Sequence, residues 1–230
     1  MATTDRRRPR TLAERALADL QEAILHGEIA PGTPLRLEKL ARTLEMSPMP
    51  VREAVRQLEA LGLAEHVPHR GARVSRLSVD DLRDTYEARL ALETLAVRRA
   101  AARFTEEDAA AAHRRIDEHV RAYRAGDLRA GREAHAAFHL GLYDASGSRW
   151  LPRLIRPLWE NSERYRIASL HASGSLQRRT REHQRIVEAC AAHDADAADE
   201  ALRSHLVLTA NLVARWLGED DLFPGEAAPG

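Results

Sequence analysis

The sequence lacks most of what secreted and membrane proteins need. Among its 230 residues there is one cysteine, Cys190, so an internal disulfide is excluded and we expect a protein of the reducing cytoplasm. Basic residues near the N-terminus are not followed by an apolar run, and we therefore expect no signal peptide. Since no stretch of about 20 uncharged apolar residues is present either, we expect nothing that spans a membrane.

Aromatic residues are scarce as well, at 4% of the chain, and β-branched residues are few. Alanine, leucine, arginine and glutamate dominate instead, a mixture that favours helices over sheets. The apolar share of 44% is enough for a packed core, and the charged share of 30% is typical of a soluble protein. The length fits one large domain or two small ones.

There is no excess of charge of either sign, because 35 basic residues balance 35 acidic ones. The distribution is less even: residues 1–76 hold 13 basic and 10 acidic residues, and the remainder holds 22 and 25. Four arginines stand together between Arg6 and Arg10, in a segment that we expect to be a disordered tail over residues 1–10. This asymmetry alone is weak evidence for nucleic-acid binding.

The next part of the chain predicts three short helices followed by a hairpin. The first helix begins with the capping-box pattern Thr11-x-x-Glu14 and stops before Gly27. Apolar spacing and turn signals place the other elements at 37–44, 48–61, 64–67 and 72–75. This order of elements is the layout of a winged helix-turn-helix, and we expect a DNA-binding domain over residues 11–77.

The third predicted helix carries polar side chains at its N-terminus, the end that enters the major groove in such domains. Ser47 is expected to cap it, and prolines in its first turn are tolerated because those backbone N–H groups have no intrahelical acceptor. Arg52 is expected to read a base or clamp a phosphate, because a guanidinium can bond guanine bidentately. The other DNA-contact candidates in this helix and beside the wing turn are Met49, Arg56, Arg70, Gly71 and Arg73. The alternative is a small helical domain with ordinary surface arginines.

A series of fixed spacings favours the DNA-binding interpretation. They are Ile24-x-x-Gly27-x-Ile29-x-Pro31-Gly32-x-x-Leu35, Leu40-Ala41, Ser47-x-x-Pro50-Val51-Arg52-Glu53-Ala54, Leu58-Glu59-x-x-Gly62-Leu63 and Arg70-Gly71-Ala72-x-Val74. Together they resemble the GntR family of bacterial regulators over nearly all of residues 12–76. The resemblance implies operator and phosphate contacts at Ser47, Pro50, Arg52 and Arg70-Gly71, with Arg36 as a further backbone contact. Relatives often have arginine where this chain has Pro48, so a base contact at that position is not carried over.

From residue 78 onward the pattern is helical throughout. Capping patterns and Gly/Ser breaks separate six helices, whose expected starts are Ser78, Thr105, Asp127, Ser148, Ser175 and Asp196. The motifs Glu87-x-Arg89-x-x-x-Glu93, His135-x-x-Phe138-His139-x-x-Leu142, Glu182-His183-x-x-Ile186 and His205-Leu206 resemble the FCD domain of the FadR-like branch of the family. The resemblance implies an antiparallel bundle of six to seven helices over residues 78–218 that binds an effector. Residues 219–230 are expected to form a flexible tail.

Four histidines in this half could share one metal ion. His135 and His139 are four residues apart, so they project from one helix face, and His183 and His205 lie on two further helices. Imidazoles converging from several helices of a bundle build transition-metal sites. The alternative is that the 11 histidines are ordinary polar residues. We interpret seven of them in that way, in turns, in the wing or on exposed faces: His26, His66, His69, His113, His119, His171 and His193.

The family pattern strengthens the metal interpretation for His139, His183 and His205. Relatives commonly have an acidic residue where this chain has His135, which could instead be a neighbour of the site without binding the metal. Four neutral nitrogen ligands would favour zinc, nickel or copper over manganese or magnesium, and zinc is our first expectation, with nickel possible.

Arg89 is our candidate for the effector. It could be a surface arginine, but the resemblance places it in the effector cavity, where a guanidinium can hold a carboxylate bidentately. We therefore expect a small organic acid as ligand and a homodimeric repressor that binds double-stranded DNA at an inverted repeat. One alternative is a helical metalloenzyme, although the sequence contains no His-Glu-x-x-His motif. The other is a scaffold whose helical half only dimerises.

Overall fold

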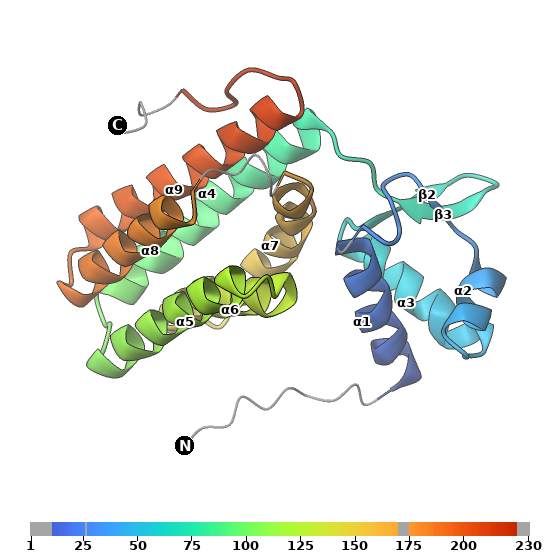
Figure 1. Cartoon of the computed structure of the whole chain (residues 1–230), viewed down its shortest axis with the longest axis horizontal. Coiled ribbons are helices and arrows are strands. Elements are labelled where there is room, and N and C mark those ends of the chain that lie inside the picture. The colour runs from blue at the N-terminus through green and yellow to red at the C-terminus, as the bar shows by residue number, and fades with distance from the viewer. Residues whose placement is uncertain (1–10, 26, 170–174, 225–230) are drawn as a thin grey trace. The chain divides into compact units, whose positions relative to one another are not determined.

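The computed structural model describes residues 11–25, 27–169 and 175–224, and Figure 1 shows the helices and strands. The chain divides into two compact units: Met1–Leu77 with Glu163–Ala168, and Ser78–Ser162 with Ser169–Gly230. The expected fold class is confirmed, with a three-helix winged unit followed along the chain by a helical unit. The predicted tail over residues 1–10, residues 225–230 of the predicted C-terminal tail, His26 and His171 lie outside the described residues.

The first unit contains helices α1 (Leu12–Leu25), α2 (Leu37–Thr43) and α3 (Pro48–Ala60), and strands β1 (Pro34–Leu35), β2 (Ala64–Val67) and β3 (Gly71–Val74). Its helices form where predicted because each buries an apolar stripe: Leu20 of α1 and Val55 and Leu58 of α3 meet in one core. The capping box at the start of α1 is confirmed, since the Glu14 backbone N–H donates to Thr11 Oγ1 at 3.1 Å and the Thr11 N–H donates to the Glu14 carboxylate at 3.1 Å.

The wing is a three-stranded antiparallel sheet in the order β1-β3-β2. The sequence predicts β2 and β3, with β3 one residue late, but it does not predict β1, because two residues cannot show a strand period. The β2–β3 turn reverses through two left-handed residues, His69 at φ 61° and Gly71 at φ 81°. Glycine adopts this conformation without steric cost, and the backbone at Gly71 can therefore come close to a partner.

The second unit contains α4 (Val79–Ala101), α5 (Glu106–Arg124), α6 (Leu128–Asp144), most of α7 (Leu151–Ala168), α8 (Leu176–Ala191) and α9 (Ala195–Trp216). Most helix starts follow the predicted caps: Ser78 accepts from the Asp81 N–H, Thr105 and Asp108 form a capping box, and Ser175 accepts from the Arg178 N–H. Two differ: α7 begins three residues after the expected Ser148, and α9 begins one residue before the expected Asp196, with Asp194 as its cap. Within this unit α4 packs against α9 and α6, α5 packs against α6 and α8, and α8 packs against α9. Figure 1 shows α4, α8 and α9 side by side and α5 beside α6.

Candidate functional site

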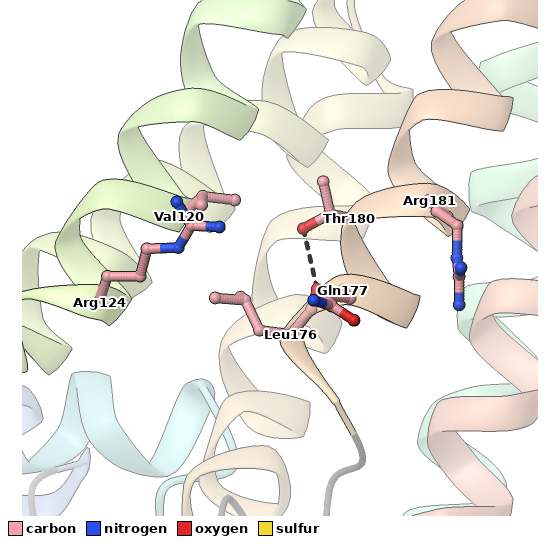
Figure 2. A pocket seen from close by; sticks show the side chains of 6 residues that line it. All are labelled: Val120, Arg124, Leu176, Gln177, Thr180 and Arg181. Carbon is pink, nitrogen blue, oxygen red and sulfur yellow. Dashed lines mark hydrogen bonds between the residues drawn. The ribbon is translucent and has the colours of Figure 1, made fainter.

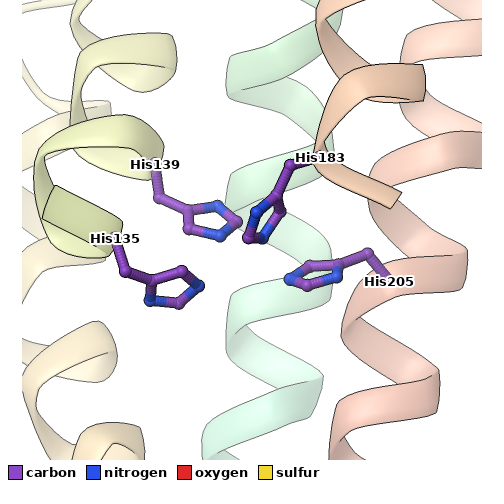
Figure 3. Close-up of side chains that lie close together, drawn as sticks. All are labelled: His135, His139, His183 and His205. Atoms are coloured by element: carbon purple, nitrogen blue, oxygen red, sulfur yellow. The ribbon is translucent and has the colours of Figure 1, made fainter. Parts of the chain in front are cut away.

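Four buried histidine rings meet between three helices of the second unit (Figure 3). His135 and His139 come from α6, His183 from α8 and His205 from α9, and each ring is at most 7% exposed. One ligand atom from each lies within 4.8 Å of all the others. Nitrogens that share one zinc ion are about 3.3 Å apart in tetrahedral geometry, so small rotations of these rings would bring all four to one ion. These are the four residues that the sequence predicts as metal ligands.

The local sequence places these rings in an apolar setting. The i, i+4 spacing puts His135 and His139 on the buried face of α6, which also carries Phe138. The Phe138 ring centroid lies 4.7 Å from that of His183, and the Trp159 ring of α7 lies 5.7 Å from that of His135. Aromatic walls of this kind restrict water and strengthen every electrostatic interaction inside them.

His205 and His183 each keep a ring nitrogen available to bind a metal ion. His205 Nδ1 lies 2.8 Å from Oε2 of Glu182, which can only accept, so Nδ1 carries the proton and Nε2 keeps its lone pair. His183 Nε2 is buried and makes no hydrogen bond with any described residue. Burial, reinforced by the neighbouring His205 and His139 rings, holds the pKa of His183 well below its usual value, and the neutral form that it favours is the one that binds metals. An orphaned buried nitrogen in a set of imidazoles fits a transition-metal ion.

A second chain of polar groups leads from His139 to Arg89. The Tyr143 hydroxyl donates to the Glu93 carboxylate and lies 3.3 Å from His139 Nδ1, which is thereby placed to donate to it. Glu93 accepts from Arg89 Nε at 2.7 Å and from Arg89 Nη2 at 3.3 Å, and Arg89 Nη1 donates to Ser162 Oγ at 3.0 Å. Burial alone lowers the pKa of Arg89, but Glu93 outweighs it and raises that pKa above its usual value. The guanidinium of Arg89 therefore already has an anionic partner inside the protein.

His119 was expected on an exposed face, and this expectation is wrong. The ring is 3% exposed, its centroid lies 5.4 Å from that of His135, and its Nδ1 lies 2.8 Å from the carbonyl oxygen of Gly131. The signal was in the sequence: His119 falls three residues after Ile116 and seven after Ala112, on the buried stripe of α5. The other expectations hold where they can be examined: His66, His69 and His113 are exposed, and His193 lies in a turn.

The recognition-helix candidates lie on the exposed face of α3. Ser47 occupies the N-cap position as expected, but its hydroxyl makes no capping hydrogen bond within the described chain. Met49 is 73% exposed, Pro50 is half-buried, and Arg52 and Arg56 are exposed. Neither arginine has an ion pair or hydrogen bond with a described residue. The N-terminus of α3 is therefore polar at Ser47, and Arg52 and Arg56 are available to contact DNA.

The wing candidates differ in whether their side chains already have a partner within the protein. Arg70 and Gly71 are exposed at the turn, and Arg36 is exposed at the start of α2. Arg73 is held by a partner on the opposite strand: its Nε donates to Glu65 at 2.7 Å, and the two residues face one another in the β2–β3 register. Arg73 can reach a phosphate only by leaving or sharing that carboxylate.

Comparison with known families accounts for both units. Residues 12–74 match the family model of bacterial regulatory proteins, gntR family, and residues 84–208 match that of the FCD domain, which alone covers more than half of the chain. The chain belongs to the GntR family of regulators and carries an FCD domain. The winged unit is therefore the DNA-binding module of a transcriptional regulator.

Relatives extend over almost the whole chain. The HTH-type transcriptional repressor GlaR of Escherichia coli (strain K12) is 30% identical over 82% of this chain and 89% of its own length. A Paenarthrobacter nicotinovorans protein, named as the probable D-xylose utilization operon transcriptional repressor, is 32% identical over 90% of this chain and 91% of its own length.

Solved structures repeat the fold. McbR/YncC of E. coli superposes with a TM-score of 0.78 over 90% of this chain and 99% of its own, at 22% identity. A GntR family regulator from Pseudomonas syringae pv. tomato str. DC3000 has a TM-score of 0.51 at 29% identity, over 90% of this chain and 86% of its own. In the part of the chain that the structure describes, no helix is both long and apolar enough to cross a membrane.

Proposed function

We propose that this GntR regulator is a cytoplasmic, homodimeric repressor whose operator affinity depends on a small organic acid bound next to a divalent metal ion. The observation that carries the proposal is the cluster of four buried imidazoles in a chain that also bears a winged helix with free arginines. Two of its relatives are named as repressors, which supports repression here.

The metal would be held by His139, His183, His205 and His135. Neutral imidazoles suit zinc, nickel and copper better than the oxygen-seeking manganese or magnesium, and we propose zinc, with nickel as the alternative. When bound, the ion supplies a concentrated positive charge that attracts a carboxylate oxygen. The protein's own part is to orient the rings: Glu182 fixes the tautomer of His205, and Tyr143 does the same for His139.

On the DNA, two chains would place two α3 helices on half-sites of an inverted repeat, about one helical turn apart. Arg52 and Arg56 would contact base edges or phosphates, with Ser47, Met49 and Pro50 lining the groove. The wing would reach the backbone through Arg70 and Gly71. Arg36 would add a phosphate contact, and Arg73 would do so if Glu65 releases it.

Helix α7 offers a physical link between sensing and binding. Its Trp159 ring lies 5.7 Å from His135 at the cluster, and its last residues, Glu163–Ala168, group with the winged unit. A ligand that repositions the rings would bias α7 and so change operator affinity. In this proposal the cluster has no catalytic role, because the carboxylates linked to its rings, Glu182 directly and Glu93 through Tyr143, are already committed to hydrogen bonds.

The test is selection of duplexes from a random pool by the metal-loaded protein. Anisotropy titrations of the selected duplex then follow, with and without acetate, malonate, succinate, malate and citrate. We expect enrichment of an inverted repeat and a change of about tenfold or more in its Kd with one of these acids, lost when the metal is removed. Absence of any enriched sequence, or operator affinity that ignores both metal and acids, would contradict the proposal. Turnover of an acid by the protein would favour the metalloenzyme alternative.

A further inference from the structure

Arg179 of α8 is a largely buried residue whose cation has no anionic partner among the described residues. Its side chain belongs to a residue that is only 9% exposed, and its Nε is buried without a hydrogen bond to any described residue. The contact that holds the guanidinium is the face of Tyr123, whose ring centroid lies 5.1 Å from Arg179 Cζ. A cation–π contact offsets only part of the cost of burying a charge, so a site of this kind is incomplete until an anion arrives.

Arg89, in contrast, has its anionic partner within the protein. Both arginines are buried in the same unit, but Arg89 makes two hydrogen bonds to Glu93 and one to Ser162. A carboxylate ligand could use Arg89 only by displacing Glu93, at the cost of leaving that carboxylate buried without its cation. At Arg179 no described carboxylate has to be displaced.

Arg179 lies one helical turn from a predicted metal ligand. Arg179 and His183 are four residues apart on α8, as His119 and Tyr123 are on α5, and the two helices pack against one another. The His119 ring centroid lies 6.4 Å from that of His183. Four neutral imidazoles would leave the charge of a divalent ion uncompensated, and Arg179 adds one more positive charge beside it.

A groove of about 300 Å³ runs between the same two helices (Figure 2). Val120 and Thr180 line it and are next in sequence to His119 and Arg179, which are not among its lining residues. Figure 2 shows Leu176 and Thr180 of α8 between the two helices, opposite Val120 and Arg124 of α5. Arg181 also lines the groove and lies on the far side of α8 in this view. Both arginines are exposed, so the groove is positively charged at its rim as well.

We propose that Arg179 binds the carboxylate of the acidic effector where α5 packs against α8, and that Arg89 stabilises the fold and does not bind the effector. This inference rests on the proposed function, which supplies the class of ligand, a small organic acid. A planar guanidinium stacked on Tyr123 keeps its N–H edge available for a bidentate bond to a carboxylate. The acid bound there would neutralise the positive charge that Arg179 and the metal leave in the interior.

The first experiment needs no ligand. Thermal unfolding of Arg179→Met is compared with that of Arg89→Met in a buffer free of small carboxylates and phosphate. If Arg179 lacks an anionic partner in the ligand-free protein, its replacement by an apolar side chain of similar length leaves Tm unchanged or raises it by about 2–4 °C. Arg89→Met, in contrast, lowers Tm because it leaves the Glu93 carboxylate buried without its cation. A Tm for Arg179→Met that falls as far as that of Arg89→Met would overturn the proposal and give Arg179 a purely structural role.

The second experiment measures binding by calorimetry on the zinc-loaded protein with acetate, malonate, succinate, malate, citrate and inorganic phosphate. We expect at least one carboxylate to bind, to bind at least tenfold more weakly to Arg179→Met, and to bind with unchanged affinity to Arg185→Met, an exposed arginine of the same helix. Zinc content should be the same in all three proteins. The proposal would be overturned if the protein bound phosphate but no carboxylate, or bound no anion at all. It would also be overturned if a carboxylate bound with the same affinity to the wild type and to Arg179→Met. Arg179-dependent carboxylate binding that leaves operator affinity unchanged would support this site and contradict the proposed regulation.

Discussion

Oε2 of Glu182 lies 2.8 Å from Nδ1 of His205. Glu182 is on α8, one residue before the predicted ligand His183. The carboxylate fixes which His205 nitrogen carries the proton and raises the basicity of the other. We predict that Glu182→Ala weakens zinc affinity by about 10–100-fold, because the imidazole is no longer oriented. Glu182→Gln, which still offers an acceptor oxygen, should lose less.

The matched control is Glu188→Ala, an exposed glutamate on the same helix. Competition with a fluorescent zinc chelator measures all three variants. Equal zinc affinity in Glu182→Ala and Glu188→Ala would show that Glu182 does not support a metal ligand.

The Arg89–Glu93 pair predicts strong non-additivity in stability. The residues are 5% and 0% exposed, so removing either partner leaves the other charge buried. We expect Arg89→Met and Glu93→Leu each to lower the free energy of unfolding by about 3–5 kcal/mol, and the double variant to be destabilised by less than the sum of the two. Urea unfolding measures this. Additive losses would mean that the pair is not coupled.

Operator binding should depend on Arg52 more than on a surface arginine elsewhere. If Arg52 reads a base, Arg52→Ala costs about 1–3 kcal/mol on the selected operator and relaxes the preference at one position. Arg114, exposed on α5, provides the control Arg114→Ala. An equal loss on all sequences would assign Arg52 to a phosphate, and no loss relative to the control would remove it from the interface.

Cys190 reports on the integrity of the helical unit. The thiol is 0% exposed, and burial raises its pKa to about 12. A raised pKa stabilises the fold below the unfolded thiol's pKa of about 8.5, and this contribution is lost as the pH rises toward 12. At pH 8 we therefore expect a thiol reagent to label Cys190 only through opening of the fold, and more slowly when zinc is bound. Labelling at the rate of a free thiol would contradict the buried position.

The sequence predicts most helix boundaries because their signals are local. Ser78 and Thr105 show a cap followed three residues later by an acidic partner, and α4 and α5 begin where these patterns stand. The four cluster histidines were also predictable, two from their i, i+4 spacing and two from the family motifs. The strand β1 was not, because Pro34 and Leu35 become a strand only by pairing with β3.

Non-local partners explain what the sequence could not provide. The i, i+4 spacing of Arg89 and Glu93 favours their ion pair, but nothing in that segment says that Ser162 and Tyr143 complete the network. Likewise, nothing around Arg73 says that Glu65 holds it across the hairpin. Arg179 belongs to no motif that we identified. It matters because it is buried against Tyr123 with no carboxylate from a described residue, and only packing determines that.

The most direct test of the account is the metal content of the protein. It would be purified without chelator or metal-affinity resin, offered zinc and nickel, and analysed by mass spectrometry. We predict about one transition-metal ion per chain, and less than a tenth of that in a variant with His139, His183 and His205 replaced by alanine. A control that loses the exposed His66, His69 and His113 instead should keep its metal. Wild-type protein that takes up neither metal, or a cluster variant that holds as much as the control, would contradict the central claim.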